Sequence, residues 1–307
     1  MTGPKHTSNG VAHLLVATII TSVGLVALLP QPTALVWQVS VIIGEAGYWL
    51  VIPATLLLIG WKQSPLRTVA TVMTLVWITL LLTPLAQGFV LARSLPDRLT
   101  ARFGHPQPRS PFADNTRATP LSIISLITGI SSTNIIVDEH VYPGVDGTEL
   151  RLDLYRPAFA EGALPIVVMI HGGSWMDGDK GDFPALNEYL AARDYVVAAI
   201  SYRLAPHVRF PAAQQDVDEA VRYLKGLRDT HGVDPTRIAL IGRSAGAQIA
   251  LLAAYTSADP AIRGVVSFYG PAALRWGDAN PKNRGCRFEW HLGGLSRGTA
   301  VDARRAV

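Results

Sequence analysis

The sequence feature that most constrains the fold is a serine flanked by glycines at the end of a short apolar run. The run is Ile238–Ile241, and the next five residues read Gly-Arg-Ser-Ala-Gly, with the serine at position 244. An apolar helical pattern follows directly and continues to Tyr255. A strand that turns this sharply into a helix strains the residue at the turn, and only glycines let neighbouring backbone pass so close. The pattern therefore predicts a strand, a tight turn at Ser244 and a helix.

In this setting, the G-x-S-x-G pattern is typical of the turn that exposes a nucleophilic serine above a sheet. The first N–H groups of the following helix would point to where negative charge develops on a substrate. We therefore interpret Ser244 as a nucleophile. An ordinary tight turn between a strand and a helix of a doubly wound sheet is the alternative that this motif alone leaves open.

The first third of the chain is far more apolar than the rest. Hydrophobic residues make up 49% of the whole sequence and charged residues only 16%. Three long stretches with no charge or a single one, residues 11–29, 34–60 and 69–92, are each long enough to cross a hydrocarbon core of about 30 Å as a helix. The sequence thus predicts a three-helix transmembrane region over residues 1–93, with buried core helices as the alternative. A linker with a short apolar helix is expected over residues 94–133.

The positions of lysine and arginine predict the orientation of these spans. The first loop, residues 30–33, has neither, whereas Lys5, Lys62 and Arg67 lie on the opposite side. The positive-inside rule then favours a multi-pass membrane protein with its C-terminal domain on the external face. Several arginines directly after the third span argue against this orientation, namely Arg93, Arg98, Arg102 and Arg109.

From residue 134 onward, short β-type runs alternate with helical patterns. Ile135–Tyr142 and Glu149–Tyr155 alternate apolar and polar residues, which predicts an antiparallel hairpin. Pro165–Ile170 and Tyr195–Ser201 are continuous apolar runs, as expected of strands buried on both faces. The other elements expected here are helices over 183–193 and 212–228 and strands over 237–241 and 262–268. Strands alternating with helices predict an α/β fold with a mostly parallel sheet.

Two further motifs precede the serine. His171-Gly172-Gly173-Ser174-Trp175 follows a buried strand, and its glycines free backbone N–H groups to approach a reacting carbonyl, as an oxyanion hole requires. Residues 201–206 read S-Y-R-L-A-P. With H-G-G, Y-R-L-A-P and G-x-S-A-G in this order, the chain resembles the α/β-hydrolase superfamily, and within it the membrane-anchored and hormone-sensitive-lipase-type serine esterases. The resemblance covers roughly residues 134–277, and it places a hydrolase domain over 134–280.

This resemblance implies roles for individual residues. Ser244 would be the nucleophile, and the N–H groups of Gly172, Gly173 and Ala245 would bind the tetrahedral oxyanion. In the family pattern, His171 shapes the loop and is not the catalytic base. Three further residues are interpreted as structural supports of this loop and the next helix, namely Tyr202, Arg203 and Asp216.

The function implied by the resemblance is hydrolysis of carboxylic esters through an acyl-enzyme, with a small-molecule ester or a lipid as substrate. Two alternatives stay open. One is an amidase or formamidase of the same fold, and the other is a non-catalytic membrane protein that carries a hydrolase remnant. The membrane is the other partner that the sequence predicts.

The acid and the base of the catalytic triad are not identified from the sequence. In this superfamily they follow the serine in the chain, but no buried β-run follows Phe268. The candidates beyond that point are Asp278, Glu289, Asp302 and His291. The histidines at 105, 140, 207 and 231 precede Ser244, and nothing around them indicates a base. We therefore expect a C-terminally incomplete hydrolase domain that hydrolyses p-nitrophenyl esters no faster than its Ser244→Ala variant.

The C-terminal segment, residues 281–307, is basic and has no helical or strand periodicity. It holds six lysines and arginines against two acidic residues. An arm for nucleic acid or anionic lipid is the alternative, but we interpret the segment as an irregular tail and expect no nucleic-acid partner. The carboxylates Asp177, Asp179 and Asp182 alternate with Gly and Lys, which indicates a solvated loop. Accordingly, the sequence predicts neither a metal site nor a cofactor.

Overall fold

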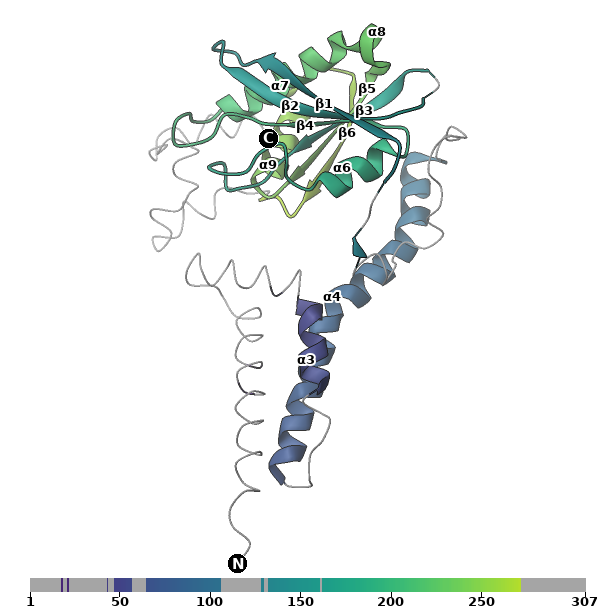
Figure 1. Cartoon of the computed structure of the whole chain (residues 1–307), viewed down its shortest axis with the longest axis vertical. Helices are drawn as coiled ribbons and strands as arrows, with labels where there is room; N and C mark the ends of the chain where they lie inside the picture. The colour runs from purple at the N-terminus through teal and green to yellow at the C-terminus, as the bar shows by residue number, and fades with distance from the viewer. Residues whose placement is uncertain are drawn as a thin grey trace, which may run out of the picture. The chain divides into compact units, whose positions relative to one another are not determined.

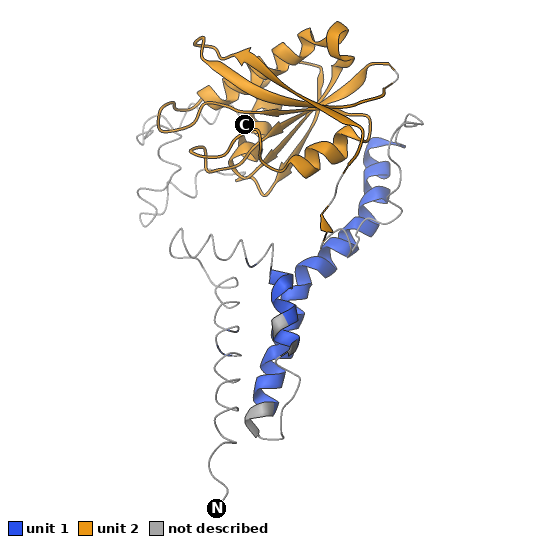
Figure 2. Cartoon of the chain, viewed as in Figure 1, with its two compact units in different colours: residues 1–106 blue, residues 107–307 orange. Residues whose placement is uncertain are grey.

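The structure is a computed structural model of the whole chain. It describes residues 47–56, 65–105, 132–160 and 162–271, together with the single positions 18, 21, 43, 128 and 129. The chain divides into two compact units, residues 1–106 and residues 107–307, which Figure 2 shows in different colours. The first unit holds the predicted transmembrane region, and the second holds the predicted hydrolase domain.

One long helix dominates the described part of the first unit. Helix α4 runs from Pro65 to Phe103, and the short elements η1 (Gly47–Leu50) and α3 (Val51–Leu56) precede it (Figure 1). The buried residues of α4 recur at helical spacing, namely Ala70, Thr74, Trp77 and Leu81. One face of α4 therefore packs against η1 and α3, where a Cβ atom on Gly47 would lie 2.9 Å from Leu81 Cδ2.

Helix α4 is the one helix within the described ranges that is long and apolar enough to cross a membrane. It contains the predicted span 69–92 and then continues to Phe103. The helix therefore continues through residues 94–103, which the sequence analysis assigned to the start of the linker. Span 11–29 and most of span 34–60 lie outside the described residues, as does nearly all of the apolar stretch 121–130. The described residues thus contain one candidate span, at the third predicted position, and do not support the predicted three-helix anchor.

The second unit is built on a six-stranded mixed sheet with the strand order β1-β2-β4-β3-β5-β6. The strands are β1 (Ile135–Pro143), β2 (Glu149–Pro157), β3 (Leu164–Ile170), β4 (Val196–Ile200), β5 (Val233–Arg243) and β6 (Ile262–Phe268). The pairs β1–β2 and β2–β4 are antiparallel, and β4, β3, β5 and β6 run parallel. The predicted hairpin and the α/β arrangement are confirmed. Strand β5 begins earlier than predicted, at Val233, with a register shift opposite Pro165 and Ile166.

Helices cover both faces of this sheet (Figure 1). Helix α6 (Pro184–Ala191) packs on one face, and α7 (Ala212–Gly226), α8 (Arg228–His231) and α9 (Ala245–Thr256) lie on the other. Successive side chains of a strand point to opposite faces. In β3, Val168 therefore joins the core on the side of α7 and α9, while Val167 and Met169 join the core on the side of α6. This two-sided burial explains the continuous apolar run in the sequence.

Candidate active site

The three sequence motifs meet at one edge of the sheet. The H-G-G motif follows β3, the Y-R-L-A-P motif follows β4, and Ser244 follows β5. Because these three strands are parallel neighbours, their carboxyl ends lie side by side. In open α/β sheets, this edge is where ligands bind. The fold thus brings together the segments that the sequence analysis singled out.

Ser244 has a backbone conformation that serine rarely adopts. Its φ is 51° and its ψ is −119°, which lies outside the ordinary left-handed helical region. Such strain persists only where the surrounding structure holds it, and it is concentrated at functional sites. Ser244 is partly exposed, and its hydroxyl does not cap helix α9, which begins at the next residue. The hydroxyl is therefore not used as a helix cap and can face a ligand, as expected of a nucleophile.

The glycines on both sides of Ser244 are required by close backbone contacts. A Cβ atom on Gly246 would lie 2.2 Å from the carbonyl oxygen of His171 and 2.3 Å from that of Ile170. A Cβ atom on Gly242 would lie 2.2 Å from the carbonyl oxygen of Gly246. No side chain fits at either position. The turn after β5 is consequently packed directly against the end of β3, as the sequence pattern predicted.

Three backbone N–H groups beside Ser244 are available to bind an anion. The N–H groups of Gly172, Gly173 and Ala245 donate no hydrogen bond to any residue that the structure describes. Gly172 lies against the serine, because a Cβ atom on it would be 3.4 Å from Ser244 Cβ. Ala245 is the first residue of α9, where the helix leaves its own N–H groups unpaired. These are the groups that the sequence predicted as oxyanion donors.

Gly173 begins a loop whose backbone is unusual over three residues. Its φ is 108°, and Ser174 and Trp175 follow with φ values of 54° and 61°. The Gly173 carbonyl accepts hydrogen bonds from the N–H groups of Met176 and Asp177, at 3.0 Å each. These two hydrogen bonds orient the Gly173 carbonyl toward the loop.

His171 is buried and supports this loop. Its Nδ1 donates to the carbonyl of Gly172 at 2.7 Å, and its ring stacks on Tyr202 with a centroid distance of 4.3 Å. Burial lowers the pKa of His171, so the neutral imidazole is favoured. The Tyr202 hydroxyl donates to the His171 carbonyl at 3.1 Å. Both side chains fix the strand-to-loop junction that carries Gly172 and Gly173.

Arg203 and Asp216 join the Y-R-L-A-P loop to helix α7. Asp216 is fully buried and accepts the Arg203 backbone N–H at 2.9 Å and its guanidinium Nη2 at 2.7 Å. Arg203 also binds Asp146, in the turn of the β1–β2 hairpin, at 2.6 Å. The hydrogen bonds to Asp216 raise the pKa of Arg203, which stays charged. This arrangement agrees with the structural role predicted for both residues.

The acidic loop after the H-G-G motif is held by its own turns. The carboxylate of Asp177 accepts the Gly178 N–H at 2.8 Å, and that of Asp179 accepts the Gly181 N–H at 2.7 Å.

Trp175, at the start of this loop, is buried and donates from Nε1 to Gln248 of α9 at 3.1 Å. Gln248 was not singled out from the sequence, where a glutamine inside an apolar helical pattern is its only signal.

No general base contacts Ser244 among the residues that the structure describes. The candidates from the sequence, Asp278, Glu289, His291 and Asp302, all lie outside them. One cluster was missed in the sequence, because its members lie far apart in the chain. It consists of Asp138, His140 and His231, at the opposite end of β5.

Comparisons with known proteins match this part of the chain. A family model described as BD-FAE matches residues 152–280. The chain is 37% identical over 114 residues to isoprenylcysteine alpha-carbonyl methylesterase ICME of Arabidopsis thaliana, which covers 37% of this chain and 27% of the relative. It is 31% identical over 191 residues to probable carboxylic ester hydrolase LipM of Mycobacterium tuberculosis, which covers 57% of this chain and 43% of the relative.

A solved structure titled "Bacterial Heroin Esterase" is 29% identical, with a TM-score of 0.41, and the match covers 47% of this chain and 46% of that one. The chain spans less than half the length of each of these relatives. Together, the family model and the curated relatives confirm the predicted resemblance: the segment from residue 152 to residue 280 is similar to esterase-type α/β-hydrolases.

Proposed function

We propose that this protein hydrolyses carboxylic esters with Ser244 as the nucleophile. The observation that most supports the proposal is the strained backbone of Ser244, which lies beside three N–H groups without partners among the described residues. Strain and unpaired donors at one point carry a cost for a purely structural turn. A site that binds an oxyanion would account for both the strain and the unpaired N–H groups.

In the proposed reaction, Ser244 Oγ attacks the ester carbonyl carbon, and its proton passes to a base. The carbonyl oxygen becomes an oxyanion that accepts hydrogen bonds from the N–H groups of Gly172, Gly173 and Ala245. Collapse of this intermediate releases the alcohol, which takes the proton, and leaves an acyl-serine. A water molecule then attacks the acyl-serine and releases the carboxylic acid and free Ser244. Each step conserves atoms and charge with no cofactor.

The names of the relatives favour an ester over an amide as the substrate. They are called a methylesterase and a carboxylic ester hydrolase. Within that class, we assign a small-molecule ester or a lipid, since the hydrolase segment is joined to an apolar unit. An amidase or formamidase of the same fold is the second candidate.

The decisive test compares the full chain with its Ser244→Ala variant on p-nitrophenyl acetate and butyrate. Loss of the nucleophile should lower the rate by at least about 1,000-fold, as it does in serine proteases. Equal rates would overturn the proposal and agree with the lack of activity expected from the sequence. Assays with N-formyl substrates separate the formamidase, because only that enzyme would favour them.

The same assay identifies the base. His291 is the one histidine that follows Ser244 in the sequence, and the order serine, acid, histidine is that of the superfamily. His291→Ala should therefore lower the rate about as much as Ser244→Ala. His105→Ala, which removes a histidine of the first unit, is the matched control and should leave the rate unchanged.

The proposal also includes a multi-pass membrane location with the hydrolase domain on the external face. Helix α4 supports it, because Val72, Leu75 and Val76 are about half exposed although no charge lies between residues 69 and 92. Apolar side chains on the outer surface of a helix suit lipid better than water. The protein should stay in the membrane fraction after a high-pH carbonate wash. Recovery in the supernatant would contradict the anchor, and reporter fusions after Arg117 would test the orientation.

A further inference from the structure

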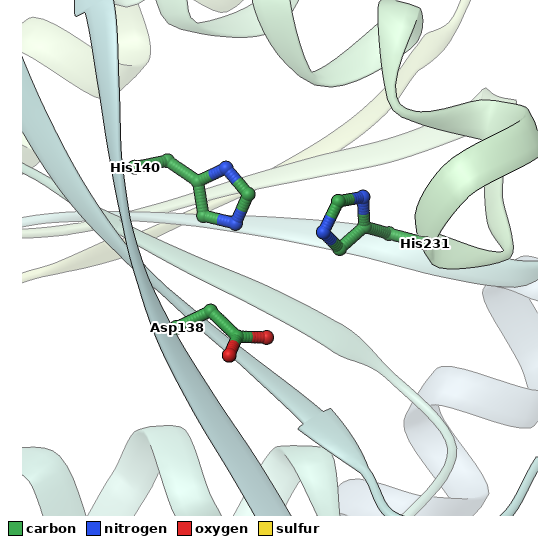
Figure 3. Close-up of side chains that lie close together, drawn as sticks. All are labelled: Asp138, His140 and His231. Carbon is green, nitrogen blue, oxygen red and sulfur yellow. The ribbon is translucent and has the colours of Figure 1, made fainter.

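Three side chains of metal-binding types converge on the second unit, away from Ser244. Asp138 and His140 lie on β1, and His231 is the last residue of α8 (Figure 3). One ligand atom from each residue lies within 4.8 Å of the others. Asp138 and His140 are two residues apart on a strand, so their side chains leave the same face of the sheet. The cluster is therefore a product of the fold, formed between an edge strand and a short helix.

The two imidazole rings are oriented by hydrogen bonds at Nδ1. His140 Nδ1 lies 3.0 Å from the hydroxyl of Tyr223 on α7, and His231 Nδ1 lies 2.8 Å from the hydroxyl of Thr230. In the tautomer whose Nδ1–H donates to the hydroxyl oxygen, the lone pair of the neutral ring is on Nε2. In Figure 3, the second nitrogen of each ring faces the space shared with Asp138.

His140 Nε2 is a buried atom that lacks a partner among the described residues. A buried acceptor without a hydrogen bond is unfavourable, and each such atom in a folded protein calls for an explanation. The neighbouring ring of His231 meets it edge-to-face, with a centroid distance of 4.9 Å. A cation between the two rings would satisfy the lone pair of His140.

The carboxylate of Asp138 keeps one oxygen for such a cation. Arg156 donates from Nε and Nη2 to Oδ2 of Asp138, at 3.1 Å and 2.8 Å. Oδ1 has no partner within the described ranges. The arginine thus fixes the direction of the carboxylate while leaving one oxygen open to the cluster.

We propose that Asp138, His140 and His231 bind one Zn²⁺ ion through a carboxylate oxygen and two Nε2 atoms, with water in the fourth position. Two imidazoles and a carboxylate form a ligand set suited to zinc. Ligands at about 2.0–2.2 Å from a tetrahedral ion lie roughly 3.4 Å apart. Side-chain shifts of about 1 Å therefore convert the present spacing into a coordination sphere. The bonds from Nδ1 to Tyr223 and Thr230 hold the two rings in orientation, as the outer contacts of metal-binding histidines do.

The position of the cluster assigns the ion a structural role. Strand β5, Val233–Arg243, separates His231 from Ser244, a distance on the order of 30 Å. The ion would not touch the acyl-transfer site. It would instead connect the edge strand β1 to helix α8. Because this site exists only in the folded chain, binding of the ion would stabilise the folded state.

Metal binding is tested with the full chain in detergent, stripped with a chelator and titrated with Zn²⁺ by calorimetry. Wild-type protein should bind one more equivalent of Zn²⁺ than the His140→Gln and His231→Gln variants. Binding of this equivalent should raise the melting temperature of the wild type only. Tyr223→Phe should weaken the affinity by about 10–100-fold without abolishing binding. His207→Gln, which removes an exposed histidine, is the matched control and should bind like wild type.

Cobalt gives a second measurement that a purely structural effect of the substitutions would not imitate. Co²⁺ bound by two imidazoles and a carboxylate in four-coordinate geometry absorbs visible light strongly, and the band should be missing from both histidine variants. Equal zinc stoichiometry in wild type and both variants would overturn the proposal. The absence of any binding, or loss of the same equivalent in His207→Gln, would overturn it as well.

Discussion

The two ends of the parallel strands both contain left-handed backbone, but they place it in different residues. Near the amino ends of β4 and β5, Asp194 and Gly232 have φ values of 63° and 62°. Near the carboxyl ends of β3 and β5, the residues with positive φ include Ser174, Trp175 and Ser244. Glycine and aspartate adopt this conformation readily, and they commonly follow helices, as both do here. Serine and tryptophan do not.

This difference shows at which end of the strands the backbone conformation is strained. Asp194 and Gly232 end helical segments at little cost, because their residue types suit the conformation. The close contacts of Gly242 and Gly246 hold Ser244 in this conformation, and burial and the hydrogen bond to Gln248 hold Trp175. Strain maintained at one edge only is a sign of function there. The predictions that follow compare variants at the carboxyl edge with matched variants at the amino edge.

The largest effect is expected for Gly246→Ala. The new Cβ atom would meet two backbone carbonyls at 2.2 Å and 2.3 Å, so the turn after β5 must move. Overpacking typically costs about 1–3 kcal/mol, and backbone neighbours make the upper end the expectation. A displacement of about 1 Å at the nucleophile lowers kcat/KM roughly 100-fold. Urea unfolding and esterase kinetics measure the two effects.

The matched control is Gly226→Ala, at the end of α7. A Cβ atom there would meet nothing within 4 Å. Alanine is the better helix former, so stability should stay unchanged or rise by up to about 1 kcal/mol. If Gly226→Ala and Gly246→Ala destabilise the protein equally, the contrast between the edges is wrong.

A similar loss of stability but a smaller loss of activity is expected when the buried ion pair is broken. Asp216→Ala leaves the Arg203 guanidinium without its fully buried partner. Removing one member of a buried pair costs about 3–5 kcal/mol, but Arg203 retains its bond to Asp146, which favours the lower value. Because the pair supports the loop and not the serine itself, kcat/KM should fall less than in Gly246→Ala.

The comparison at the amino edge is Lys225→Met. Lys225 forms an ion pair with Asp259, and both side chains are partly exposed. Such pairs contribute about 0–1 kcal/mol, and the variant should unfold within that range of wild type. Equal destabilisation by Asp216→Ala and Lys225→Met in urea would show that burial does not decide the outcome here.

The sequence predicted those parts of the fold that depend on local pattern. A short continuous apolar run is typical of a strand that is buried on both faces. Residues 165–170 do form such a strand. A glycine at position 246 indicates a close backbone contact, because a residue without a Cβ atom fits where others do not. The structure shows this contact. These inferences need no knowledge of distant residues.

Features that depend on distant contacts could not be predicted. His140 and His231 meet only because α8 lies beside β1, and no spacing in the sequence encodes that contact. Helix α4 extends past residue 93 although Pro96 and the arginines around it are typical of a linker. Leu95, Leu99 and Phe103 are all exposed there, so burial of an apolar face does not explain the extension. The triad acid and base were not assigned from the sequence, and their candidates lie outside the described residues.

The smallest effect is expected from two tyrosines at opposite ends of β4. Tyr202 follows the strand, and its hydroxyl donates to the His171 carbonyl at 3.1 Å. Tyr195 precedes the strand, and its hydroxyl makes no hydrogen bond to the described residues. Tyr202→Phe should cost about 1 kcal/mol of stability. It should also lower kcat several-fold with little change in KM, since a looser loop misplaces donors that act mainly in the transition state. Tyr195→Phe should change neither quantity. A rise in KM at constant kcat in Tyr202→Phe would show that the loop binds the substrate and does not stabilise the oxyanion.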